Sequence, residues 1–454
     1  MPAVPTAATS RKTELELENR ELRKHSVTPL LNLDLEPFAG DVICRCRAAV
    51  PRLRRVPLTV ECVCVVYSYT SEINFFLAKE ENSLPLLVWW TPFMPNGYRT
   101  ISCSNGLYEC IVTKNRSWHQ TDVAAYLFYA SHIQNNDFPL PRNKNILWAV
   151  FHEESPKNYA PFLFDETQRL FNITSTFSRY SDVPVTLQYL PNIGLIKDMK
   201  YYVPTTIKNQ YLNKLSPVLY IQSDCDTPIG RDYLVRELGK FVSIDSYGKC
   251  LRNKTFPKSL LNLDPLDLYN EKLLNFTSRY KFIIAFENAI CDDYVTEKLW
   301  RPLIVGSIPI YLGSPNIQDW LPNNNSAILV QNFNDLQEVG DMIKKITSNN
   351  TLYEGFLEHK LIQISSMIIR FLFLNVLFVK NFIKKNVDAD INKKKQSIYN
   401  CPKPDKSQKG NTWYQQWDIG KCQALALKIL INKNKPYTLK HFDDTWKALL
   451  HNKT

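Results

Sequence analysis

Apolar and polar residues alternate along this chain in blocks that are typical of an α/β protein. Short apolar runs, each about the length of a buried strand, are separated by polar segments with helical spacing. Strands are expected at residues 58–69, 86–90, 124–129, 146–151, 218–221, 241–244, 282–286, 308–312 and 327–330. Helices are expected at residues 230–240, from near 296, at 335–347 and at 423–431. Strands that alternate with helices predict parallel sheets covered by helices.

The order of these blocks divides the chain into five parts. A weakly structured leader is expected at 1–57, a first α/β domain at 58–202 and a second at 203–360. An apolar block followed by a lysine-rich block makes up 361–396, and a tail at 397–454 regains globular character. Residues 361–379 have about the length of a membrane span, but Arg370 lies at their centre, which favours a buried helix or sequence foreign to the native protein. No signal peptide is evident in the polar residues 1–26.

Charge and motifs narrow the classes of function. The 454 residues carry a net charge of +11, which suits an anionic substrate such as a nucleotide. A nucleic-acid surface in the lysine-rich block would need interleaved aromatic residues, and Phe382 is the only one between 380 and 395. The chain contains no GxGxxG, GxxxxGK[ST] or GxSxG motif. A phosphate group would therefore be held by side chains and helix N-termini rather than by a glycine-rich loop.

Cysteines and glycosylation sequons indicate an oxidising compartment. The eleven cysteines form no CxxC…CxxC zinc pattern, and Cys103 and Cys110 flank a short segment that a disulfide could close. Seven Asn-x-Ser/Thr sequons occur, with Asn115 and Asn172 as the candidates for glycosylation. The sequons begin at Asn115, Asn172, Asn253, Asn275, Asn324, Asn349 and Asn452.

Three segments could supply cations to a diphosphate. Arg231 lies in the first turn of the helix that follows the strand at 218–221. Arg279 comes immediately before the strand at 282–286, and Lys298 stands at the start of the next helix. Any single one of these residues could also be an ordinary surface charge.

Carboxylates and one tyrosine complete the candidate chemistry. Glu297 could accept both hydroxyls of a ribose, and Tyr294 could stack on the sugar or the base. The segment His152-Glu-Glu-Ser-Pro follows a predicted strand, so a glutamate there could take a proton from an acceptor hydroxyl. Alternatively, Asp224 and Asp226 could hold a divalent cation on a diphosphate, as in a metal-dependent transferase of another fold.

Several motifs resemble those of the glycosyltransferase family 10 fucosyltransferases. The main one is FENAICDDYVTEKLWRPLIVGSIPIYLGS at 286–314, and WAVFHEESPKN at 148–158 and TFSRYSDVP at 176–184 are similar to further family motifs. Their details resemble the protein O-fucosyltransferase branch. The resemblance runs from about residue 89 to 360 and includes the tail from residue 399.

The resemblance implies a GT-B fold, in which two Rossmann-like domains face each other across a cleft and the second holds GDP-L-fucose. It implies an inverting transfer that needs neither metal nor cofactor, with Glu154 as the general base. The positions that it assigns to the donor are Ser223, Arg231, Arg279, Asn288, Tyr294, Glu297 and Lys298. The acceptor is either Ser or Thr of a folded protein module or GlcNAc of a glycan, in an α1,3 linkage.

The resemblance also implies a place in the cell. Family members are normally single-pass type II membrane proteins of the Golgi apparatus or the endoplasmic reticulum. The leader shows no anchor, and residues 361–396 replace the polar segment usual in this branch. The alternative is a protein that binds a nucleotide sugar but has lost turnover. Retention of Glu154, Glu297 and Lys298 argues against it.

Overall fold

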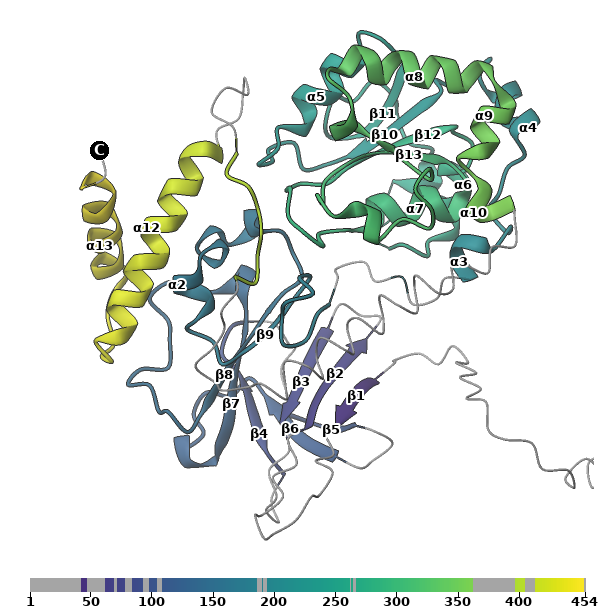
Figure 1. Ribbon diagram of the computed structural model, residues 1–454. Helices are drawn as coiled ribbons and strands as arrows, with labels where there is room; N and C mark the ends of the chain where they lie inside the picture. The colour runs from purple at the N-terminus through teal and green to yellow at the C-terminus, as the bar shows by residue number, and fades with distance from the viewer. Residues whose placement is uncertain are drawn as a thin grey trace, which may run out of the picture. The chain divides into compact units, whose positions relative to one another are not determined.

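The computed structural model of this chain contains two α/β domains and a helical tail, all within residues 42–454 (Figure 1). The structure describes residues 42–46, 62–68, 72–77, 84–92, 98–103, 108–185, 190, 194–261, 263, 267–361, 397–404 and 413–452. The predicted leader before residue 42 and the segment 362–396 lie outside these ranges. In the described part of the chain, no helix combines the length and apolar character needed to cross a bilayer.

The second domain is built on a five-stranded parallel sheet. Its strand order is β11-β10-β12-β13-β14. The strands are β10 (Val218–Gln222), β11 (Ile244–Gly248), β12 (Phe282–Phe286), β13 (Ile308–Leu312) and β14 (Ile328–Leu329). The predictions for β12 and β13 match to the residue. The strand predicted at 241–244 overlaps β11 only at Ile244, because residues 241–243 form the turn before it. The buried Asp245 and Ser246 make the rest of β11 read as a polar segment.

Helices cover both faces of this sheet (Figure 1). Alternate residues of β12 point to opposite faces, so Phe282 and Ile284 contribute to one core and Ile283 to the other. The first core includes residues of α5 (Arg231–Leu238), α8 (Leu336–Ser348) and α9 (Asn350–Gly355). The second core includes residues of α3 (Gly194–Lys197), α6 (Glu271–Thr277) and α7 (Glu297–Val305). The remaining helices of this domain are α4 (Thr205–Tyr211) and α10 (Glu358–Leu361).

The first domain has a six-stranded sheet with the order β5-β6-β4-β7-β8-β9. The strands are β4 (Leu86–Trp89), β5 (Tyr98–Cys103), β6 (Tyr108–Thr113), β7 (Val123–Tyr129), β8 (Leu147–His152) and β9 (Ile173–Thr176). All neighbours pair in parallel except β5 with β6. A separate antiparallel sheet contains β1 (Val42–Cys46), β2 (Cys62–Ser68) and β3 (Glu72–Leu77).

The parallel strands of both domains follow the same order, 2-1-3-4-5. In each case the chain passes from the first strand to one side and then returns to the other side. Sheets of this order bind ligands at the carboxyl ends of strands 1 and 3, which here are β4 with β7 and β10 with β12. The predicted α/β class with two Rossmann-like domains is confirmed by this topology.

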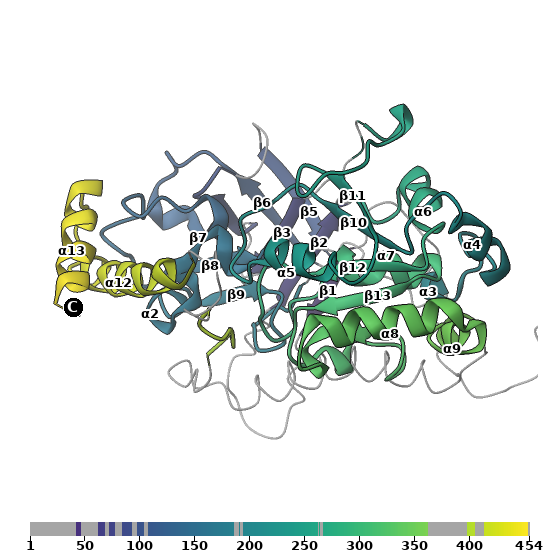
Figure 2. The ribbon, with the colours of Figure 1, turned by 90° about the horizontal axis from the view of Figure 1, so that it is seen from above.

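The tail packs against the first domain. Figures 1 and 2 show α12 (Trp413–Asn432) beside α13 (Leu439–His451) and next to α2 (Asp165–Gln168). Leu427, Leu430 and Phe442 belong to the same core as Phe128 and Trp148 of the first sheet. The helix predicted at 423–431 is therefore present, but it begins ten residues earlier.

Candidate active site

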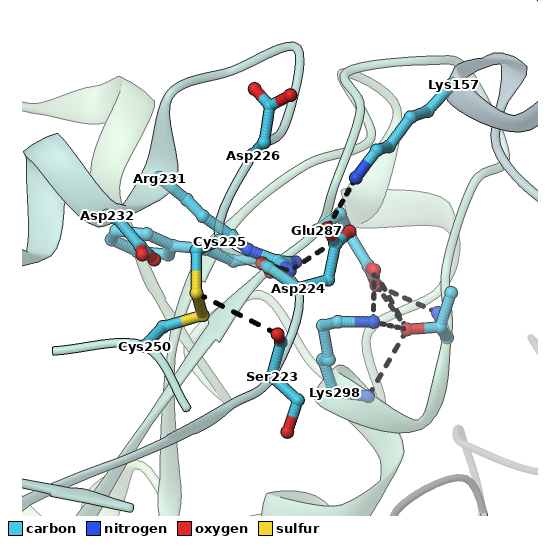
Figure 3. Close-up of polar contacts among 12 residues, drawn as sticks. Lys157, Ser223, Asp224, Cys225, Asp226, Arg231, Asp232, Cys250, Glu287 and Lys298 are labelled. Carbon is cyan, nitrogen blue, oxygen red and sulfur yellow. Dashed lines mark hydrogen bonds and ion pairs between the residues drawn. A yellow bond between two sulfur atoms is a disulfide. The ribbon is translucent and has the colours of Figure 1, made fainter. Parts of the chain in front are cut away.

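Arg231 marks the ligand-binding end of the second sheet. It is the first residue of α5, and its side chain is 1% exposed. Its Nη2 donates to the carbonyl oxygen of Asp224, just after β10, at 2.6 Å. Its Nη1 donates to the carbonyl oxygen of Phe286, the last residue of β12, at 3.4 Å. The guanidinium therefore joins the two strand ends at which sheets of this order bind ligands (Figure 3).

Next to Arg231 lies a group of ionised and hydroxyl side chains, Glu287, Thr296, Glu297 and Lys298, which we call the donor cluster. Thr296 is the N-cap of α7, and its amide and hydroxyl donate to the fully buried Glu287 at 2.9 and 2.8 Å. The Lys298 ammonium lies 3.0 Å from Glu297 Oε1 and 3.4 Å from Glu287 Oε2. The start of the helix is thus fixed by one cation between two carboxylates.

Burial and charge oppose each other in the donor cluster. Burial disfavours the charged forms of Glu297 and Lys298, but their mutual attraction outweighs it. The pKa of Glu297 consequently lies below its ordinary value and that of Lys298 above it. For Glu287, burial dominates and raises the pKa of the carboxyl. Glu297 and Lys298 are therefore both charged at neutral pH.

Several polar atoms of this region are buried without a partner among the described residues. Glu297 Oε2 and Asn288 Oδ1 are acceptors, and Arg231 Nε is a donor. Buried polar atoms in folded proteins are nearly always hydrogen-bonded, so such a group of exceptions indicates a ligand. Two acceptors beside a cationic donor suit sugar hydroxyls next to a phosphate.

Glu154 approaches the donor cluster from the first domain. It lies just beyond the end of β8 (Leu147–His152), which is the ligand-binding edge of that sheet. Burial and the neighbouring Glu153 carboxylate raise the pKa of Glu154 to about 7, although Lys298 opposes this shift and Glu297 adds to it. The charges of Lys298 and Glu297 influence Glu154, so its carboxylate lies within electrostatic range of the donor cluster. A carboxylate with a pKa of about 7 can act as a base at neutral pH.

Glu153, the residue before the proposed base, contributes to the raised pKa of Glu154. Its Oε1 accepts a hydrogen bond of 2.9 Å from the hydroxyl of Tyr129, at the end of β7. Its Oε2 is buried and has no hydrogen-bond partner in the described ranges. Burial raises the pKa of Glu153. The carboxylate is therefore fixed on one side and free to accept on the other.

The loop between β12 and α7 is held by the first domain. Arg179, three residues after β9, donates from Nε to Asp293 Oδ1 at 2.8 Å and from its amide to Oδ2 at 2.9 Å. Its Nη2 lies 2.6 Å from Asp293 Oδ1 and 2.8 Å from Asp319. Asp293 has a φ of +65°, which few residues other than glycine adopt, so these contacts hold a strained backbone in place. Next to it, the Tyr294 ring meets Phe177 edge-on at 4.9 Å.

The tail segment 397–404 braces the same loop from the other side. The disulfide Cys291–Cys401 links the loop to the tail, and the Asp292 amide donates to Asn400 O at 3.0 Å. Tyr399 stacks on Phe177 at 4.6 Å and lies 2.9 Å from Nδ1 of the buried His152. Burial lowers the pKa of His152 to about 3, so this histidine is neutral.

Not every predicted donor residue joins the site. Arg231, Asn288, Tyr294, Glu297 and Lys298 do, and Ser223 lies exposed in the loop after β10. Arg279 lies three residues before the amino end of β12, and Glu287 follows its other end; the five residues of the strand alone span about 16 Å. Its side chain instead packs on the ring of Phe276 at 4.5 Å and donates to the carbonyl oxygen of that residue. Its assignment to the donor is therefore not supported by its place in the fold.

The acidic pair of the β10 loop does not converge. Asp224 contacts Lys157 and Arg231, whereas Asp226 accepts a hydrogen bond of 3.0 Å from the Trp413 indole. Figure 3 shows the two carboxylates pointing in different directions. Between them Cys225 forms a disulfide with Cys250, so these sulfurs cannot act as thiolate ligands, although with Asp232 they form a cluster of potential ligand atoms.

The predicted disulfide and glycosylation sites stay predictions. Cys110 is buried opposite Ile101 in the β5–β6 pairing, and the side chain of Cys103 lies outside the described residues. Asn115 and Asn172 are exposed. The carbonyl oxygen of the Asn172 amide accepts a hydrogen bond from the Trp148 backbone.

An apolar cavity of about 210 Å³ opens beside the site. It lies between the segment after Glu154, the loop before Arg231, the start of the β12–α7 loop and the tail. Its walls include Ile229, Ile290, Trp413, Trp417 and Lys157.

Sequence reasoning missed several residues that shape the site. Arg179 and Asp293 both lie in recognised motifs, at 176–184 and 286–314, but neither motif shows that they pair with each other. The partners in the disulfide Cys291–Cys401 are 110 residues apart, and eleven cysteines allow many other pairings. For such positions the available signal is that they lie within a family motif although no role in the site is assigned to them.

The chain matches known proteins along most of the described domains. Residues 211–369 match the model "Glycosyltransferase family 10 (fucosyltransferase) C-term", and residues 81–189 match "Fucosyltransferase, N-terminal". It is 37% identical over 405 residues to the Xenopus laevis protein named GDP-fucose protein O-fucosyltransferase 3, which covers 81% of this chain and 86% of that protein.

Of two other relatives, one has the same name and one a different name. The human protein named GDP-fucose protein O-fucosyltransferase 3 is 44% identical over 303 residues, which are 64% of this chain. The match spans 62% of the length of that human relative. The Drosophila melanogaster protein named alpha-(1,3)-fucosyltransferase B is 46% identical over 299 residues, 65% of this chain and 67% of that protein.

Proposed function

Because the chain belongs to glycosyltransferase family 10, the fucosyltransferases, we propose that it transfers L-fucose from GDP-L-fucose to an acceptor hydroxyl. The observation that carries this proposal is that Glu154, beyond the end of β8, lies within electrostatic range of Glu297 and Lys298 at the start of α7. A base for the acceptor and charged groups for the donor thereby lie in one site.

The donor is held by the second domain. Arg231 and Lys298 attract the diphosphate, and the start of α5 adds backbone N–H groups. Glu297 Oε2 and Asn288 Oδ1, which have no partner among the residues described, accept hydroxyls of the sugars. Tyr294, buried against Phe177, shapes the wall beside them.

The transfer follows from these positions in one displacement. Glu154 takes the proton of the acceptor hydroxyl while the acceptor oxygen forms a bond to C1 of fucose. The bond from C1 to the β-phosphate oxygen breaks on the opposite side, and its electron pair leaves with GDP. Arg231 and Lys298 stabilise the charge on the departing diphosphate. A single displacement inverts the configuration at C1, and this route needs neither a metal ion nor a cofactor.

For the acceptor we favour a Ser or Thr hydroxyl of a folded protein module. Two of the relatives are named as protein O-fucosyltransferases, whereas the fly relative is named as an α-(1,3)-fucosyltransferase. GlcNAc of a glycan is therefore the second candidate. We further propose that the chain acts in the lumen of the Golgi apparatus or endoplasmic reticulum, as part of a membrane-associated protein. The two disulfides, Cys225–Cys250 and Cys291–Cys401, support an oxidising compartment.

The test is release of GDP from GDP-fucose with folded modules and with free oligosaccharides as acceptors, with and without a chelator. Glu154→Gln should lower turnover by about 10²–10⁴-fold and leave GDP binding intact, because it removes only the base. Glu271→Gln, at an exposed glutamate on α6, is the matched control and should keep full activity. Full activity of Glu154→Gln would refute the role of the base, and activity that disappears with chelator would refute the metal-independent mechanism.

A further inference from the structure

Lys157 is a third cation beside the donor site, and it comes from the opposite domain. It lies three residues after Glu154, in the short helical turn Pro156–Asn158 that follows β8. Its ammonium crosses to the second domain and lies 2.5 Å from Asp224 Oδ1. Figure 3 shows Lys157 extending from its own segment toward the loop that carries Asp224 and Arg231.

Asp224 brings Lys157 and Arg231 together. The second oxygen of this carboxylate, Oδ2, lies 3.7 Å from Arg231 Nη2, and its backbone carbonyl accepts from the same nitrogen. The side chain of Asp224 is 43% exposed, whereas those of Lys157 and Arg231 are 17% and 1% exposed. The carboxylate thus faces outward while it holds two cations side by side.

The other cation of the site is already matched by negative charge. Lys298 lies between the carboxyl groups of Glu287 and Glu297, so part of its charge is already offset by the ionised Glu297. The diphosphate of the bound donor brings further negative charge, and the β-phosphate gains more when its bond to the sugar breaks. Arg231 and Lys298 alone leave that charge poorly compensated, because the carboxylates of the donor cluster repel it.

We infer that Lys157 is a further donor-binding residue, which contacts the diphosphate and stabilises it as the leaving group. This inference rests on the proposed function, because it assigns a role within the same site. Asp224 holds the ammonium next to Arg231, and the phosphate oxygens take over that contact when the donor binds. Lys157 lines the apolar cavity, and its ammonium lies 6.0 Å from the centre of the Trp413 ring, which helps to hold it beside the site. Because Lys157 follows Glu154 by only three residues, its contact with the diphosphate would also help to position the base.

The experiment measures the dissociation constants of GDP and of guanosine for the wild type, Lys157→Met and Asp224→Asn. Lys157→Met should raise the Kd for GDP at least about tenfold and leave that for guanosine unchanged, because only GDP offers phosphate oxygens. Asp224→Asn frees the lysine from its carboxylate, so GDP should bind as tightly as to the wild type or more tightly. Lys200→Met, which removes an exposed lysine paired with Glu271, is the matched control and should change neither constant.

The outcomes separate this inference from the proposed function. If Lys157→Met and Asp224→Asn weaken GDP and guanosine alike, the pair only links the domains, and the inference is refuted. If the wild type binds GDP and Lys157→Met binds it equally well, the inference fails while the proposed function stands. Failure of the wild type to bind GDP at all would refute both.

Discussion

The ion pair of Arg179 with Asp293 offers a quantitative test of how the two domains are joined. Asp293 is fully buried and Arg179 is 17% exposed, so their contact is shielded from water. Arg179→Met removes the guanidinium but keeps the backbone amide that donates to Asp293. The carboxylate also keeps a hydrogen bond of 2.8 Å from the side chain of Asn316.

The expected loss follows from the bonds that disappear. The charge-assisted hydrogen bond from Nε to Asp293, which contributes about 1.5–3 kcal/mol, is removed together with the ion-pair contact of Nη2. The contact with Asp319 adds little, because that side chain is 47% exposed. The free energy of unfolding should therefore fall by about 3–5 kcal/mol, the range expected when one partner of a buried ion pair is removed.

Thermal and urea denaturation measure this loss. Arg169→Met is the matched control, because Arg169 forms a comparable pair with Asp165 that is largely exposed, and it should cost only about 0.3–0.5 kcal/mol. The double variant Arg179→Met with Asp293→Asn should recover part of the stability, since it no longer buries an unpaired charge. Equal effects of Arg179→Met and Arg169→Met would refute the view that this pair fixes the loop.

Three further predictions test the base, the tail and the donor cluster. Transfer should decline as the pH falls through about 7, because the Glu154 carboxylate must be ionised to act as the base. Glu153→Gln removes a neighbouring negative charge and should move this decline to lower pH. A pH profile that does not move in this variant would contradict the assignment of the base. Cys291→Ser should lower the free energy of unfolding by about 2–5 kcal/mol, as judged by denaturation without reductant, because the disulfide it removes closes a loop of more than a hundred residues. Gly313→Ala should weaken GDP binding and lower the free energy of unfolding by about 1–3 kcal/mol, because its Cβ would lie 2.6 Å from a glutamate of the donor cluster. In the control Gly355→Ala, the Cβ meets no atom within 4 Å, so this change should be neutral or stabilising.

The sequence by itself determined the elements that carry the donor site. The continuous apolar runs at 282–286 and 308–312 define strands whose two faces are both buried, and that pattern is local. Arg231 and Lys298 follow strand ends at the starts of helices, so their place at the ligand-binding edge could be read from order alone. β11 was displaced in the prediction because its buried polar residues resemble a loop.

Only the tertiary structure decided which distant residues meet. Glu154 and Lys298 are 144 positions apart, and nothing in their neighbours specifies their electrostatic interaction, which depends on how two domains pack. The same holds for Arg179 with Asp293, Lys157 with Asp224 and the disulfide Cys291–Cys401. Arg279 shows the converse: it is close to the site in sequence, but it lies at the wrong end of a rigid strand. Local chemistry follows from short-range pattern, whereas pairing across a site depends on long-range packing, which a residue's sequence neighbours do not encode.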